Sequence, residues 1–306
     1  MTKTIGFAMI VIGAAWWMLA AGAAEPSSGP ATQPSTQPAK ELLLDLGNKV
    51  TMNLVEIPAG RFLMGSPETE KERRKDETQH EVTISKPFYL GVYEVTQEQY
   101  EQVVGKNPST FKGAQNPVET VSWEDAVEFC QKLSQKTGKT VSLPTEAQWE
   151  YACRAGTTTP FSTGQTISSM DEANFNPGNY KEPTHEYGDG PRKYRNGTCA
   201  VGSFKPNASG LYDMHGNVWE WCSDWYSGKS DVAATDPTGP ANGGSHVARG
   251  GVWRWVPKVC RSAYRSGFDG AYRAGGYGFR VAVAAGADPV DKGADSVDKS
   301  NKVNAK

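Results

Sequence analysis

The stretch Gly210-Leu-Tyr-Asp-Met-His-Gly-Asn-Val-Trp-Glu-Trp-Cys-Ser-Asp-Trp225 carries the strongest structural signal in this chain. It contains three tryptophans, and each indole N–H needs a hydrogen-bond partner when the ring is buried. Among them lie side-chain oxygens of the kind that a hard cation such as calcium prefers. These oxygens belong to Asp213, Asn217, Glu220 and Asp224. Because the pattern follows neither a helix period nor a strand period, it predicts a buried, irregular core loop. The alternative is an aromatic core segment whose polar side chains only satisfy the indoles.

The composition is that of a soluble globular protein. Of the 306 residues, 38% are hydrophobic and 22% are charged, which lies within the usual range. The net charge of −2 gives no basic surface for nucleic acid or an anionic membrane, so we expect neither as a partner. Nine tryptophans and 33 glycines indicate a loop-rich fold with aromatic anchors.

Residues 1–24 have the features of a secretory signal peptide. Lys3 precedes an apolar run that extends to Ala20, and small residues suited to cleavage follow. The protein is therefore expected to be secreted or periplasmic. The apolar run is close to the minimum length of a membrane span, so an uncleaved N-terminal anchor is the alternative.

One domain is expected between two disordered segments. Residues 25–40 are rich in Pro, Ser and Thr, which predicts an extended linker. Residues 286–306 form a charged tail without aromatic residues, which also predicts disorder. The remaining residues, 41–285, have a length compatible with a single domain.

Local patterns within this domain predict an α+β fold with a large irregular fraction. Three helices are expected, because Thr96, Ser122 and Thr145 each begin a capping box. From residue 157 to residue 205 the chain is rich in Gly, Pro and Asn and shows little periodicity. Strand patterns occur at 52–57, 61–64, 80–85 and 88–95, and again at 247–253 and 277–283.

Four motifs identify a family resemblance. They are Leu143-Pro-Thr-Glu-Ala-Gln-Trp-Glu-Tyr-Ala-Cys-Arg154, Gly210-Leu-Tyr-Asp-Met-His-Gly-Asn-Val-Trp-Glu-Trp221, Arg249-Gly-Gly251 and Gly278-Phe-Arg280. In this order they closely resemble the formylglycine-generating enzyme (sulfatase-modifying factor) family, over residues 50–284. The resemblance implies a variant of the C-type lectin fold. It also implies an oxidase that uses oxygen and copper(I) to convert a sulfatase cysteine to formylglycine.

The copper site of that family is not reproduced here. Its two cysteines follow the Arg-Gly-Gly motif, and they correspond to Trp255 and Cys260 in this sequence. An indole does not bind copper(I), so a two-thiolate site cannot form as it does in those enzymes. A serine of the family is replaced by Val252, which removes a hydroxyl group from the same region.

Cys260 is nevertheless the candidate catalytic residue. Lys258, Arg261 and Arg265 are close to it in sequence and would lower its thiol pKa if they were also close in space. The alternative is a buried structural cysteine.

The other cysteines are expected to be structural. Cys130 and Cys153 fall on the apolar faces of the second and third helices, so we expect buried thiols. The family's disulfide partners for them are missing. An odd total of five leaves at least one free thiol or one intermolecular disulfide, and whether Cys199 and Cys222 pair is open.

Calcium is the cofactor that the resemblance supports. One family site corresponds to the side chains of Asp213 and Glu220 together with the carbonyl groups of Gly216 and Val218. Both carboxylates are present, and the carbonyl positions require only backbone.

A second calcium site of the family corresponds to Asn174 and the carbonyl group of Phe175. Its further carboxylate would fall near Lys193 to Arg195, which are not acidic, although Asp189 is close in sequence. The four histidines show no metal-ligand spacing, so we expect each to be hydrogen-bonded or exposed.

Two functions follow from these observations. The first is an exported oxidase that uses Cys260 on a protein or peptide substrate, such as a sulfatase. The second is a non-catalytic, calcium-stabilised, lectin-like domain that binds a peptide or a glycan. A monomer is expected in both cases.

Overall fold

The structure is a computed structural model that describes Met1 and residues 40–167, 169–177, 195–228 and 233–286. The expected signal peptide, most of the linker and most of the C-terminal tail lie outside the described residues. So do His185, Asp189 and Lys193. Among the described residues, no helix combines the length and hydrophobicity needed to cross a membrane.

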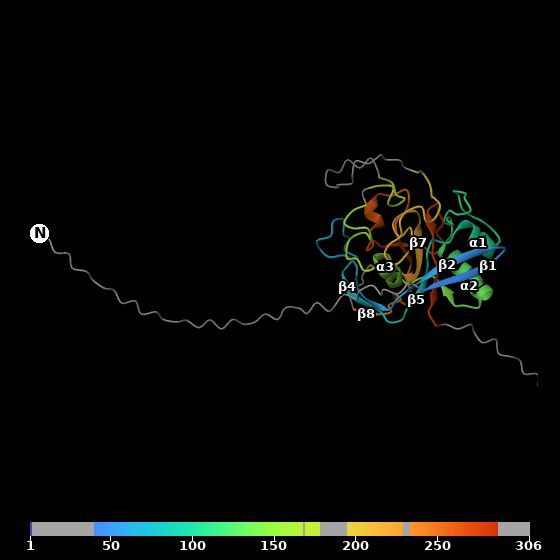
Figure 1. The fold of residues 1–306 in the computed structure, drawn as a ribbon, viewed down its shortest axis with the longest axis horizontal. Coiled ribbons are helices and arrows are strands. Elements are labelled where there is room, and N and C mark those ends of the chain that lie inside the picture. The colour runs from blue at the N-terminus through green and yellow to red at the C-terminus, as the bar shows by residue number, and fades with distance from the viewer. Residues whose placement is uncertain (2–39, 168, 178–194, 229–232, 287–306) are drawn as a thin grey trace, which may run out of the picture. The chain divides into compact units, whose positions relative to one another are not determined.

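A five-stranded sheet joins the two ends of the domain, in the order β1-β2-β5-β12-β6. Its last strand in sequence, β12, pairs with β5 on one side and β6 on the other, antiparallel to both. The helices α1 and α2 lie next to β1 and β2 (Figure 1). The strands are β1 (Glu41–Gly47), β2 (Val50–Ile57), β5 (Phe88–Gly91), β6 (Val141–Ser142) and β12 (Ala282–Ala284).

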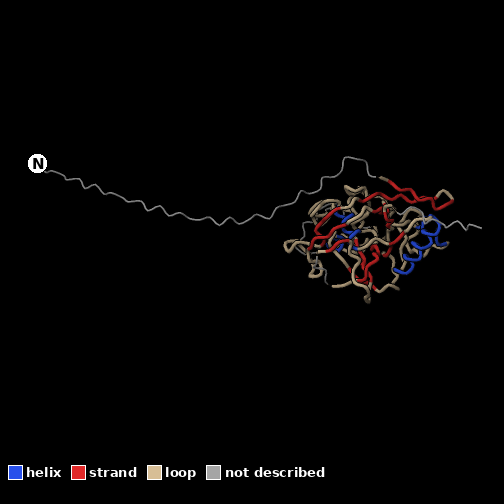
Figure 2. Tube along the Cα trace, turned by 90° about the horizontal axis from the view of Figure 1, so that it is seen from below, coloured by secondary structure: helices blue, strands red, loops and turns tan. Residues whose placement is uncertain are grey.

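Two smaller sheets complete the architecture. One has the order β10-β9-β7-β11, and the other has the order β3-β4-β8. The four-stranded sheet consists of β7 (Trp219–Trp225), β9 (His246–Arg249), β10 (Ser266–Phe268) and β11 (Tyr277–Gly278). The three-stranded sheet consists of β3 (Gly60–Met64), β4 (His80–Ile84) and β8 (Ala234–Thr235). Strands and loops make up most of the described chain (Figure 2), so the α+β prediction holds in a sheet-rich form.

The predicted irregular loop is only half correct. Gly210 to Val218 is irregular, with left-handed backbone at Asp213 and Asn217, where φ is 59° at each. The second half is wrong, because Trp219–Trp225 forms the inner strand β7. This strand is buried on both faces, so its apolar residues do not alternate with polar ones as they do in a half-exposed strand.

The three capping boxes were predicted correctly. Thr96, Ser122 and Thr145 each accept a hydrogen bond from the backbone of the third helical residue, whose side chain bonds back. The helices are α1 (Gln97–Val104), α2 (Trp123–Thr137) and α3 (Glu146–Arg154). A short 3₁₀ helix spans Pro257–Cys260. The predicted burial of Cys130 and Cys153 on α2 and α3 is confirmed.

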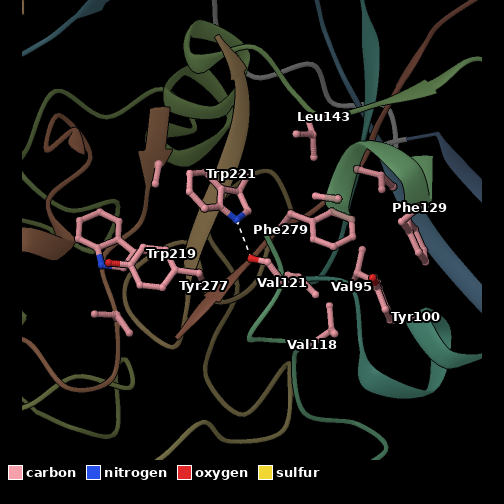
Figure 3. Packing of buried hydrophobic residues seen from close by; sticks show 14 of the residues in the cluster. Val95, Tyr100, Val118, Val121, Phe129, Leu143, Trp219, Trp221, Tyr277 and Phe279 are labelled. Atoms are coloured by element: carbon pink, nitrogen blue, oxygen red, sulfur yellow. Dashed lines mark hydrogen bonds between the residues drawn. The ribbon is translucent and has the colours of Figure 1, made fainter. Parts of the chain in front are cut away.

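Aromatic side chains fill the main core (Figure 3). Tyr100 stacks on Phe129 with ring centroids 5.5 Å apart, and Phe279 meets Phe129 edge-on at 5.3 Å. The indole N–H of Trp221 donates to the Val121 carbonyl oxygen at 3.1 Å. The polar end of this buried ring is therefore satisfied by a backbone carbonyl far away in the sequence.

Candidate functional site

Cys260 lies in the interior of the domain. It ends the 3₁₀ helix, and none of its surface is exposed. A Cβ atom placed on Gly251 would lie 2.5 Å from the Cys260 sulfur, so the Gly251 backbone covers the thiol closely. Burial raises the pKa of Cys260 to about 12. The predicted lowering of this pKa by nearby cations is therefore wrong.

The neighbouring arginines do not lower the pKa of Cys260, because they form ion pairs with carboxylates of other segments. Arg261 donates to both oxygens of Glu77, at 2.7 and 2.8 Å. Arg265 forms a two-point ion pair with Glu146, at 2.8 and 2.5 Å. These carboxylates are far away in the sequence, so local spacing gave no sign of them.

Trp255 lies in an exposed turn, five residues before Cys260 in sequence. Its side chain is 52% exposed, a large fraction for a tryptophan. The backbone beneath it is fixed, because the Trp255 carbonyl accepts from the Asn176 N–H at 2.9 Å and its own N–H donates to Val252 at 3.1 Å. All five cysteines are free thiols. Where the family has its first copper-binding cysteine, this chain therefore has an exposed indole ring on a hydrogen-bonded backbone turn.

His215 contacts the backbone of Cys260 and is buried. Its Nδ1 lies 2.8 Å from the Cys260 carbonyl oxygen, and its Nε2 accepts from the Ser162 N–H at 3.0 Å. Nδ1 therefore carries the proton. Burial lowers the pKa of His215 to about 4, so the ring is neutral near pH 7. His215 is the satisfied histidine that was expected.

A second group of polar side chains forms a buried acidic cluster, made of Glu94, Asp213 and Glu220 with Arg280. Burial raises the pKa of Glu94 well above its ordinary value, and the negative charges of Asp213 and Glu220 raise it further. Burial likewise raises the pKa of Asp213 to about 6. With all groups ionised, three carboxylates face one guanidinium, which leaves an excess of two negative charges.

Asp213 is the member of the acidic cluster with an unused oxygen. Its Oδ2 accepts from the Gly202 N–H at 2.7 Å, whereas its buried Oδ1 has no hydrogen-bond partner among the described residues. An unpartnered buried carboxylate oxygen is costly unless a cation or water meets it. This observation fits the predicted ligand role of Asp213.

Glu220 already has a strong cationic partner. Its two oxygens accept from Arg280 at 2.6 and 2.7 Å, and Oε2 also accepts from the Trp149 indole at 2.8 Å. A calcium ion would have to share this carboxylate with Arg280. The position that sequence reasoning missed is Glu94, whose carboxylate accepts from Asn217 at 2.8 Å and is fully buried. A charged residue between the apolar residues Val92 and Val95, shortly after β5, was the available signal.

The second predicted site adjoins the first. Asn174 forms a bridge with Gly216, and its side-chain nitrogen donates to Asn217 at 3.1 Å. Its Oδ1 is buried and has no partner among the described residues. Gly216 has a φ of 92°, and a Cβ there would lie 2.2 Å from the Asn174 carbonyl oxygen, so only glycine fits this contact. Phe175 is buried beside Asn174.

No three His, Cys, Asp or Glu side chains among the described residues are placed to hold a metal ion by themselves. A cation at the acidic cluster would therefore depend on the carbonyl groups of Gly216 and Val218 and on amide oxygens, as calcium sites commonly do. Asp224, which sequence reasoning grouped with these oxygens, instead accepts from the Glu146 N–H at 2.8 Å.

The chain is similar to known proteins along most of its length. Chaperone protein LppX of Paenibacillus barcinonensis is 33% identical over 262 residues, which cover 72% of this chain and 85% of that protein. Formylglycine-generating enzyme of Mus musculus is 29% identical over 287 residues, covering 75% and 74%. Among solved structures, Treponema denticola variable protein 1 superposes with a TM-score of 0.69 at 28% identity, covering 81% of this chain and 100% of that chain.

A family model agrees with these similarities. The model of the sulfatase-modifying factor enzyme 1-like domain matches residues 45–285, from within β1 to just beyond β12. The chain belongs to the sulfatase-modifying factor enzyme 1-like family.

Proposed function

We propose that this protein is an exported, non-catalytic member of its family that binds polypeptide partners and is stabilised by calcium. One observation carries the proposal. Where the two copper-binding cysteines of a formylglycine-generating enzyme would lie, this chain has an exposed Trp255 and a buried Cys260.

Cysteine oxidation of the family type does not fit this geometry. Copper(I) is held by soft thiolates, and an indole offers no such ligand. The thiol of Cys260 is covered by the Gly251 backbone. Its pKa of about 12 means that it is protonated near neutral pH. A protonated, inaccessible thiol is neither a metal ligand nor a nucleophile.

Binding of polypeptides is supported by Trp255 and by one relative. A tryptophan on a fixed turn loses little conformational entropy when a partner covers it, and tryptophan is enriched among the residues that dominate interface energetics. The relative LppX is named a chaperone protein, and a chaperone acts by binding other polypeptides. We therefore propose a polypeptide partner and not a glycan.

Calcium is supported by the acidic cluster. Among the described residues, Asp213 Oδ1 and Asn174 Oδ1 are buried without a hydrogen-bond partner, and three carboxylates lie around one guanidinium. A divalent cation would contact these oxygens and favour the ionised form of the carboxylates. Asp213, Glu94 and the carbonyl groups of Gly216 and Val218 would hold it, with Asn174 and the Phe175 carbonyl beside them. Its contribution would be to offset the cost of these buried charges.

The chemical part of the proposal is tested with the purified protein, copper(I), oxygen and a Cys-x-Pro-x-Arg peptide. We expect no aldehyde product by mass spectrometry and no copper(I) bound at Cys260. Aldehyde formation that disappears in Cys260→Ser would overturn the proposal and restore the oxidase.

The binding part is tested on an array of peptides with varied sequence. We expect a subset of peptides to be retained, and we expect Trp255→Ala to lose most of that retention. Leu63→Ala is the matched control, because Leu63 is a comparably exposed apolar residue on β3. Retention of no peptide at all, or equal losses in both variants, would contradict a binding role for Trp255.

A further inference from the structure

A row of aromatic side chains runs over the four-stranded sheet, and it is made of Tyr264, Trp219, Phe268 and Tyr272. Trp219 lies 6.0 Å from Tyr264 and 5.9 Å from Phe268 between ring centroids. Phe268 stacks on Tyr272 at 6.0 Å with an interplanar angle of 16°. Tyr272 is 43% exposed, while Phe268 and Tyr264 are half-buried. Trp219 is buried beneath them, so the row offers apolar area to solvent at Tyr264, Phe268 and Tyr272.

Guanidinium groups lie at both ends of the aromatic row and face outward. Arg74 donates to the Tyr264 hydroxyl at 3.0 Å and is paired with Asp76, yet its side chain is 43% exposed against 11% for Asp76. Arg273 follows Tyr272 in sequence, and its side chain is 47% exposed against 16% for its partner Asp125. In both pairs the cation is presented to solvent and the carboxylate lies beneath it.

Arg254 has no carboxylate partner among the described residues. Its guanidinium lies close enough to the Tyr277 hydroxyl to affect the pKa of that group, and the Tyr277 ring lies 4.8 Å from Phe268 and 5.1 Å from Tyr272. The buried arginines of the domain behave differently, since each forms an ion pair. Those arginines are Arg154, Arg249, Arg261, Arg265 and Arg280.

We infer that the aromatic row, with Arg254 beside it, is a docking surface for an acidic segment of a partner polypeptide that also carries aromatic or apolar side chains. The inference rests on the proposed function and names the class of partner. Arg254 would supply the two-point contact that a guanidinium makes with a carboxylate. The aromatic rings would bury apolar side chains of the same segment.

The charges of the surface favour an acidic partner over a basic one. Asp269, which follows Phe268 in sequence, is exposed, and it accepts the Ala271 N–H at 2.8 Å. An incoming carboxylate would meet three guanidinium groups. An incoming ammonium would meet the exposed carboxylate of Asp269, whereas Asp76 and Asp125 lie beneath their own arginines.

The test measures fluorescence anisotropy of the full mature protein with two labelled probes. One probe is a short peptide of alternating Glu and Tyr, and the other has Gln in place of Glu. We expect the Glu peptide to bind at least tenfold more tightly at low salt. We expect this preference to shrink at physiological salt, because part of it is electrostatic.

Variants locate the binding surface. Arg254→Ala is expected to weaken the Glu peptide about tenfold and leave the Gln peptide nearly unchanged, with Arg254→Lys intermediate. Tyr272→Ala should weaken both peptides. Arg61→Ala is the matched control, since Arg61 is an exposed arginine on β3 with a single long ion pair of 4.0 Å to Glu81. Thermal melts confirm that each variant folds.

The outcomes separate this inference from the proposed function. Equal affinity for the two probes, or equal losses in Arg254→Ala and Arg61→Ala, would overturn the acidic-segment inference while leaving peptide binding intact. Binding of anionic lipid vesicles in preference to the Glu peptide would overturn it as well. Failure of every peptide to bind on the array and in solution would remove the proposed function itself.

Discussion

Glu150 joins the ion pairs of α3 to the rest of the core. Its carboxylate accepts from the Gly65 N–H at 2.8 Å, from Arg154 at 2.8 Å and from Arg249. Burial alone would raise the pKa of Glu150, but the charges of Arg154 and Arg249 and these hydrogen bonds lower it overall. The negative charge is therefore part of the folded structure.

Removal of that charge should be strongly destabilising. Glu150→Gln keeps the shape but leaves buried Arg154 without its carboxylate partner and Arg249 with only Glu146, at 3.7 Å, and we expect a loss of about 3–5 kcal/mol in the free energy of unfolding. Denaturant titration measures the change. Glu128→Gln is the control, because Glu128 pairs with Lys132 at the exposed face of α2 and should cost less than about 1 kcal/mol. Similar effects of both substitutions would show that the buried network does not stabilise the fold.

Asp224 makes the stability of the domain depend on pH. Its pKa is raised in the folded state, whereas that of Glu150 is lowered. Burial, together with the neighbouring negative charge of Glu146, raises the pKa of Asp224 from 3.8 to about 7. The folded state therefore holds this proton more tightly than the unfolded state, so its contribution to stability falls as pH rises from ~4 to ~7.

Asp224→Asn should remove this dependence. At about pH 8 we expect the variant to be more stable than the natural protein, and at about pH 4 we expect little difference. Denaturant titrations at the two pH values measure both effects. Parallel pH profiles of the two proteins would show that Asp224 does not titrate as described.

At the scale of elements, the helices were easier to predict than the strands. A capping box lies within four consecutive residues, so Thr145 and Gln148 specify the start of α3 without distant help. β7 depends on β9 and β11 for its hydrogen bonds and is buried on both faces, which hides its period. Burial of Cys260 depends likewise on Gly251 and on distant carboxylates that hold the neighbouring arginines. Spacing alone could not place these partners.

The cap of α3 offers a direct measurement. Thr145→Ala removes the hydroxyl that accepts from the Gln148 N–H at 3.1 Å, and we expect a loss of about 1 kcal/mol. Thr145→Ser retains the hydroxyl and should recover most of that loss. Chemical denaturation of the three proteins tests this, and equal stability of all three would contradict the role of the cap.

At the scale of the whole molecule, calcium would link segments that are distant in sequence. Glu94 follows β5, Asn174 lies in the long irregular region, and Asp213 precedes β7. One cation among them would therefore stabilise the packing of these segments together. The family resemblance supplied the proposed ligands Asp213 and Asn174, whereas Glu94 was recognised from the folded arrangement, which brings it to Asn217.

We expect calcium to raise the melting temperature and chelation to lower it. Asp213→Asn keeps the size of the side chain and should abolish most of that shift. Asp171→Asn is the control, since Asp171 is exposed. Calorimetry detects calcium binding independently of stability. A melting temperature that is indifferent to calcium in the natural protein would remove calcium from the proposal.

The position of β12 also has a consequence for biosynthesis. Ala282–Ala284 lies between β5 and β6, so the largest sheet stays incomplete until nearly the whole domain has been synthesised. Such long-range pairing slows folding, because distant segments must meet before their contacts stabilise them. A chain whose largest sheet can form only late stays unfolded for longer. For an exported protein, as we propose this one to be, that delay would favour passage through a secretion channel before the domain folds.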